Sequence, residues 1–205
     1  MKGTGRASPP VQRGRHESLY EEYLETLSKR WPHFKLVHKR DSPLCRWLDV
    51  LLRALTFGRQ SRFMTHYVTT LGGTVYLPEL WPGWSAGRRY CVMRHEAVHI
   101  RQFKTWRWPG MCFLYLLFPL PCFFALGRAW LEWQGYAETL RATWQVYGER
   151  AANDPALRRE IVARFTGADY GWMWVLGSQV ERLLARELDT LRRDPPESLY
   201  PECSV

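Results

Sequence analysis

The stretch His95-Glu96-Ala97-Val98-His99 decides which fold and which chemistry this chain can support. It is an HExxH motif within a segment, from about Arg88 to Thr105, whose pattern predicts a helix. Two histidines four residues apart lie on one helix face, one above the other, so their imidazoles can converge on one metal ion. Glu96 is offset around the helix, where it can reach a water bound to that metal. The motif therefore predicts a metal centre with a general base beside it.

A catalytic zinc needs a third protein ligand and one open position. No histidine follows residue 99, and the extended form HExxHxxGxxH fails because Gln102 and Thr105 replace its glycine and its last histidine. A carboxylate is the natural alternative, and Glu132 is the first acid after the motif. Its mostly apolar neighbours suit a partly buried acid that a metal neutralises. We therefore expect Glu132 to be the third ligand.

The helix that carries Glu132 offers one rival ligand and two supporting residues. Glu138 lies six residues further on and points to a different face, so spacing favours Glu132. Gly135 lies one turn after Glu132, on nearly the same face. A glycine inside a helix costs roughly 1 kcal/mol relative to alanine, and here it would let this helix approach the motif helix closely. Tyr136, at i+4 from Glu132, also faces the expected site.

With these residues in place, the chain resembles the gluzincin branch of the zincin metallopeptidases over roughly residues 60–145. The resemblance is carried by HEAVH and by a second helix that bears a glutamate. In that group the two motif histidines and a glutamate from the next helix hold zinc, which implies Zn²⁺ bound by His95, His99 and Glu132. The second helix departs from the common pattern, because Gln134 and Gly135 stand where many members carry an acid and an alanine.

The resemblance implies a zinc-dependent metallopeptidase that hydrolyses peptide bonds with a metal-activated water and Glu96 as the general base. A second donor to the oxyanion is needed, and Tyr136 is the candidate, with His66 and Tyr170 as alternatives. In gluzincins a strand just before the motif helix forms the edge of a small sheet and aligns the substrate. The matching segment, to which an extended peptide would add through backbone hydrogen bonds, consists of Thr74, Val75, Tyr76 and Leu77.

The pattern around the motif predicts an α+β fold: a mainly helical, zincin-like domain with a small antiparallel sheet or hairpin before the motif helix. Arg62–Leu71 and Thr74–Leu77 are strand-like, and Gly72-Gly73 between them is a hairpin signal. Phe34–His38 is a further candidate strand. Other helices are expected over approximately residues 18–31, 43–57, 128–150, 155–166 and 178–193.

Composition predicts one domain over residues 17–193, preceded by a disordered basic arm at 1–16 and followed by a tail at 194–205. The five cysteines are odd in number and lack CxxC spacing, which argues against a disulfide framework and against a cysteine-ligated zinc. The first forty residues contain no apolar core of a signal peptide, so we expect a cytoplasmic location.

The formal net charge of +9 favours acidic partners, nucleic acid or anionic lipid, on a basic surface. It supports an alternative function: a nucleic-acid or membrane-associated binding protein whose metal site is structural or vestigial. Residues 108–127 carry no charge and approach the length of a membrane span, although Pro119 and Pro121 would break a continuous helix. A buried, kinked connector and a membrane-associated segment are the two interpretations of this run. Beyond these partners, a peptide or protein substrate is expected.

Overall fold

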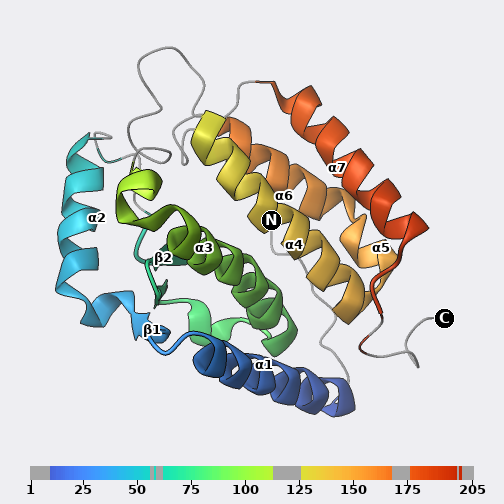
Figure 1. Ribbon diagram of the computed structural model, residues 1–205, viewed down its shortest axis with the longest axis horizontal. Helices are drawn as coiled ribbons and strands as arrows, with labels where there is room; N and C mark the ends of the chain where they lie inside the picture. The colour runs from blue at the N-terminus through green and yellow to red at the C-terminus, as the bar shows by residue number, and fades with distance from the viewer. Residues whose placement is uncertain are drawn as a thin grey trace.

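Helices make up most of the fold, and a small sheet lies beside the motif helix (Figure 1). The computed structural model describes residues 10–55, 58, 62–112, 126–167, 176–197 and 199. Within these residues the α+β, mainly helical class expected from the sequence is confirmed. The sheet is mixed rather than purely antiparallel, because its first strand pairs in parallel with its third.

The sheet contains β1 (Lys35–His38), β2 (Thr69–Leu71) and β3 (Thr74–Leu77) in the order β1-β3-β2. β2 and β3 form the expected hairpin, in which Leu71 pairs with Thr74 across Gly72-Gly73. Gly72 has a φ of +62°, which a residue without Cβ adopts at no steric cost and which a tight hairpin turn requires. The strand expected over Arg62–Leu71 is limited to its last three residues, Thr69–Leu71.

The expectation that Thr74–Leu77 forms the edge of the sheet is wrong. β3 is the central strand, so its backbone groups pair with β1 on one side and with β2 on the other. Two of its four side chains, Val75 and Leu77, are also buried in the core. The predicted substrate contacts of Thr74, Val75, Tyr76 and Leu77 are therefore corrected. Among the described strands β1 and β2 provide the edges, and β2 packs against the motif helix.

The helices follow the expected order, with shifted boundaries. Their bounds are α1 Pro10–Arg30, α2 Pro43–Leu55, α3 Ala86–Cys112, α4 Leu126–Tyr147, α5 Glu149–Ala152, α6 Pro155–Thr166 and α7 Gly177–Arg193. Two short 3₁₀ turns, η1 (Lys39–Asp41) and η2 (Trp81–Gly83), lie between them. α1 begins within the arm that was expected to be disordered up to residue 16. One reason is that His16 is buried, with its ring centroid 5.4 Å from that of Tyr147.

α4 contributes side chains to both of the buried clusters that form the core. One cluster of buried side chains joins α1, the sheet, α3 and α4, and includes Leu27, Val75 and Met93. The second joins α4 to α6 and α7, and includes Leu140 and Phe165. Helices that bury their apolar faces on both sides are held firmly, because close packing tolerates little displacement. α4 is therefore a rigid platform beside α3 (Figure 1).

α3 is the motif helix, and it is bent near its C-terminal end. Arg107 has φ +54° and ψ 177°, which is not helical, and Pro109 follows two residues later. A proline inside a helix lacks the backbone N–H and its ring clashes with the carbonyl four residues earlier, here that of Thr105, so a regular helix is disfavoured over this segment. Residues 113–125 of the uncharged run lie outside the described residues, so neither interpretation of that run is tested. None of the helices in the described ranges combines the length and hydropathy needed to cross a bilayer.

Candidate metal centre

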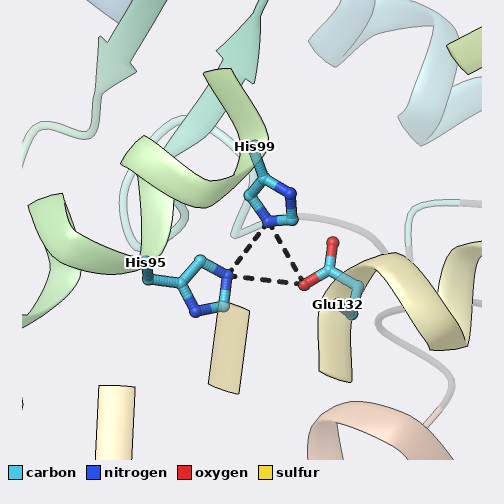
Figure 2. Close-up of side chains that lie close together, drawn as sticks. All are labelled: His95, His99 and Glu132. Atoms are coloured by element: carbon cyan, nitrogen blue, oxygen red, sulfur yellow. Dashed lines mark hydrogen bonds and ion pairs between the residues drawn. The ribbon is translucent and has the colours of Figure 1, made fainter. Parts of the chain in front are cut away.

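Three side chains from two helices point toward one another (Figure 2). The Nε2 atoms of His95 and His99 are 3.0 Å apart, and they lie 3.6 and 3.7 Å from Oε2 of Glu132. Ligands held about 2.0–2.1 Å from a tetrahedral zinc are about 3.3 Å from one another, so the observed spacings bracket that value. No other His, Cys, Asp or Glu side chains in the described part of the chain form such a group. The structure thus brings together the three ligands expected from the sequence.

The first imidazole is oriented by α4. Nδ1 of His95 lies 3.1 Å from Oγ1 of Thr139, whose hydroxyl donates to the carbonyl of Gly135 at 3.1 Å. Because that hydroxyl donates its one proton to the carbonyl of Gly135, it can act only as an acceptor for Nδ1–H of His95. The proton is therefore on Nδ1, and Nε2 presents a lone pair toward the other two ligands.

The second imidazole is oriented in the same way by Gln102. Oε1 of Gln102 lies 2.9 Å from Nδ1 of His99, and its amide nitrogen donates to the carbonyl of Leu131 at 3.0 Å. In the neutral ring, which is the form that binds a metal ion, this places the His99 proton on Nδ1 and its lone pair on Nε2. Two lone pairs and a carboxylate oxygen thus converge at one buried point, an arrangement that fits a divalent cation with nitrogen and oxygen ligands.

The charge of Glu132 dominates the electrostatics of the group. Burial alone would raise the pKa of Glu132, but the neighbouring His99 and His95 outweigh burial and hold that pKa well below its ordinary value. Burial would lower the pKa of His99, whereas the carboxylate of Glu132 outweighs it and raises the pKa to about 9. The carboxylate therefore stabilises positive charge at the point where the imidazoles meet.

Gly135 explains how α3 and α4 approach so closely. A Cβ at this position would lie 2.6 Å from Cε1 and 2.7 Å from Nε2 of His95. Both distances are shorter than van der Waals contact allows, so only glycine accommodates the ring where it is. The expectation that this glycine has a packing reason at the motif helix is confirmed.

Glu96 is buried beside the ligands and is held by a residue from the sheet. Oγ1 of Thr70, on β2, donates to Oε2 of Glu96 at 2.6 Å. The bond fixes one carboxylate oxygen of the expected general base. Sequence reasoning missed Thr70, because a threonine in a short strand is an ordinary β-former and no local signal marks it.

The remaining residues predicted for the site differ in how close they lie to the three converging side chains. The ring centroid of Tyr136 is 4.8 Å from that of His95, so this side chain lies beside the site as expected, and its role as an oxyanion donor stays a prediction. Glu138 accepts from Nε of Arg94 at 2.6 Å and is not part of the converging group, as the spacing predicts. His66 is exposed, with Nδ1 2.6 Å from Oγ1 of the adjacent Thr65. Tyr170 lies outside the described residues.

Cys91, one turn before His95, is a buried core thiol rather than a ligand. Its burial raises the pKa to about 11, which disfavours the thiolate that binds metal. The group that could hold a metal ion therefore consists of nitrogen and oxygen atoms.

Comparison of the chain with known protein families, with curated proteins and with solved structures found no match.

Proposed function

We propose that this chain is a zinc-dependent metallopeptidase of the gluzincin type. The proposal rests above all on the convergence of His95, His99 and Glu132, with the carboxylate of Glu96 buried next to them. Imidazole and carboxylate ligands suit zinc, and three protein ligands leave a fourth position for water or substrate. A structural site uses four protein ligands and has no need of a base. The donor set therefore favours a catalytic site over a structural one.

The side chains would divide the work of peptide hydrolysis. When bound, zinc supplies a Lewis acid that polarises the scissile carbonyl and makes a water acidic enough to react at neutral pH. Glu96 would accept the proton of the attacking water and deliver it to the leaving amine. Thr70 would keep the carboxylate of Glu96 in one orientation. Tyr136 is the proposed donor to the oxyanion.

An extended peptide would pair with β2, which is an edge strand, and not with β3. In a hairpin closed by a two-residue turn, the pair Leu71–Thr74 exchanges backbone hydrogen bonds. The backbone N–H and C=O of the next residue, Thr70, consequently point away from β3, toward the free edge. A peptide on that edge would run past the residue that holds Glu96.

Removing the hydroxyl of Thr70 tests its role in positioning Glu96. Thr70→Val keeps the size of the side chain and the backbone edge. We expect kcat to fall about 10- to 100-fold with little change in KM. A loss of that size in kcat corresponds to the usual energy of a buried hydrogen bond to a charged group. Thr70→Ser should restore most of kcat, and zinc content should be unaffected in both variants. Steady-state kinetics on a cleaved peptide would measure this. A Thr70→Val enzyme with wild-type kcat would remove Thr70 from the mechanism.

Metal removal tests the proposed activity itself. Purified protein incubated with a library of unstructured peptides should produce new termini, detected by mass spectrometry. We expect 1,10-phenanthroline to stop the cleavage, because the three side chains bind the ion that activates the water. After the chelator is removed, a stoichiometric amount of Zn²⁺ should restore the cleavage. Cleavage that persists after chelation, or no cleavage by the zinc-loaded protein, would contradict the proposal.

The location of the enzyme is also a proposal. We propose that it acts in the cytoplasm and associates with a membrane through residues 108–127, as the sequence suggests. The described residues that flank this run, at the end of α3 and the start of α4, are rich in tryptophan and in basic side chains.

A further inference from the structure

Three exposed tryptophans lie where α3 ends and α4 begins. The exposed fractions of Trp106, Trp108 and Trp130 are 45%, 58% and 50%. The rings of Trp106 and Trp130 contact each other edge to face, with centroids 6.3 Å apart, so the two helices contribute to one patch. We call these three residues, together with Phe103, the tryptophan surface. Several exposed aromatic side chains gathered at the adjoining ends of two helices indicate an interaction site, whereas single exposed residues do not.

The bend in α3 helps to build this surface. Phe103 and Trp108 stack with their ring centroids 5.7 Å apart, although they are five residues apart in the chain. On a straight helix such residues differ by about 140° around the axis and do not stack. The non-helical backbone at Arg107 brings them together.

The exposed charged side chains that lie next to the tryptophan surface along α3 are positive. Arg101, Lys104 and Arg107 are exposed on α3, and none of them forms an ion pair with a residue in the described ranges. The sequence has no Asp or Glu from Ala97 to Leu131. This surface therefore attracts a partner that is anionic and also accepts aromatic rings.

We propose that the tryptophan surface binds the interface of an anionic lipid bilayer. Indole rings partition into the headgroup region, and neighbouring Lys and Arg side chains attract acidic headgroups. The sequence between α3 and α4, residues 113–125, is uncharged and almost wholly apolar. A sequence of this composition lacks the amides and charges with which nucleic-acid sites bind bases and phosphates. The chemistry of the whole region favours lipid over nucleic acid.

The tryptophan surface lies close to the candidate metal centre along both helices. Trp106 lies seven positions after His99, which corresponds to about 10 Å along a helix. Trp130 precedes Glu132 by two residues. A bilayer bound here would leave the metal centre near its surface, so the substrates would be polypeptide segments at a membrane. This statement about substrates rests on the proposed peptidase function, whereas lipid binding does not.

Vesicle flotation tests the proposal with the purified full chain. We expect the protein to float with vesicles of phosphatidylcholine and phosphatidylglycerol, to stay behind with phosphatidylcholine alone, and to bind less as salt is added. The triple variant Trp106→Ala/Trp108→Ala/Trp130→Ala should bind at least about tenfold more weakly, because each indole contributes buried apolar area. Arg101→Glu/Lys104→Glu should also lose binding to the anionic vesicles.

Matched control variants distinguish loss of the tryptophan surface from a general change in charge, fold or peptidase activity. Arg182→Glu/Arg186→Glu changes the same amount of charge on exposed positions of α7 and should bind vesicles like wild type. Circular dichroism and zinc content should be unchanged in the tryptophan triple variant, which separates a lost surface from a lost fold. Glu96→Gln should float like wild type, so a failure of the peptidase proposal is distinguishable from a failure of this one.

Three results would overturn lipid binding. The first is that wild type fails to float with either kind of vesicle, or floats equally well with both. The second is that the tryptophan triple variant binds like wild type. The third is that single-stranded DNA, and not vesicles, binds the wild type and is released by the triple substitution, which would make the surface a nucleic-acid site.

Discussion

Replacing Glu96 with glutamine should abolish peptide cleavage while leaving zinc bound. The amide is nearly isosteric with the carboxylate and can still bond to Oγ1 of Thr70, so the local packing is kept. It cannot accept a proton from water, and loss of a general base lowers turnover by about 10²- to 10⁴-fold. Glu96 is not among the three converging ligands, so zinc content should match that of wild type. Initial rates on a cleaved peptide and the zinc content of the same samples measure both effects.

Glu138→Gln is the matched control for this substitution. Glu138 is also a carboxylate near the α3–α4 contact, but its partner is Arg94 and it is not part of the converging group. We expect its turnover to stay near the wild-type value. A Glu96→Gln protein that cleaves as fast as wild type would show that Glu96 is not the general base. A Glu96→Gln protein without zinc would show that Glu96 helps to hold the ion.

Gly135→Ala should destroy the metal centre without touching a ligand. The added Cβ would lie 2.6 Å from the ring of His95, so either the ring or α4 must move. The ring is held by Thr139 and α4 is held by the core on two sides, so the displacement separates the ligands. Mutation of a residue that only supports a ligand lowers metal affinity by about 10- to 100-fold. Here a ligand itself is displaced, so we expect zinc affinity to fall by about 100-fold or more. Competition with a zinc chelator would give the affinity.

Gly177→Ala is the control for adding a methyl group to a helix. Its Cβ would lie 3.4 Å from Cγ1 of Val162, which is a much milder contact than the one at Gly135. Alanine favours helix over glycine by about 1 kcal/mol, so neither substitution should fail through helix propensity. Wild-type zinc affinity in Gly135→Ala would mean that α3 and α4 are further apart than the structure places them.

The sequence predicted those parts of the site that depend on spacing within one helix. The motif fixes His95 and His99 on one face, and the interval from Glu132 to Gly135 places an acid and a glycine on one face of the next helix. The hairpin of β2 and β3 was likewise predicted, because Gly72-Gly73 is a local turn signal. Each of these features depends on residues that are close together in the sequence.

The features that sequence analysis missed depend on contacts between distant segments. β1 and β3 pair although α2 lies between them in the sequence. This pairing makes β3 the central strand and corrects the expectation that it is an edge strand. Thr139 and Gln102 are common residues on helices, and only the packing of α3 against α4 shows that they orient the two imidazoles. Thr70 reaches Glu96 from the sheet for the same reason. Periodicity reports which face of an element is apolar, and it does not report which element will cover that face.

Zinc content of Glu132→Ala, measured beside wild type and Glu138→Ala, tests the central claim most directly. The claim is that two imidazoles of α3 and one carboxylate of α4 form a single ligand set. Wild type and Glu138→Ala should each carry about one zinc per chain after equilibration with a limiting amount of free zinc, and Glu132→Ala should carry almost none. A Glu132→Ala protein that holds zinc as tightly as wild type would contradict the claim.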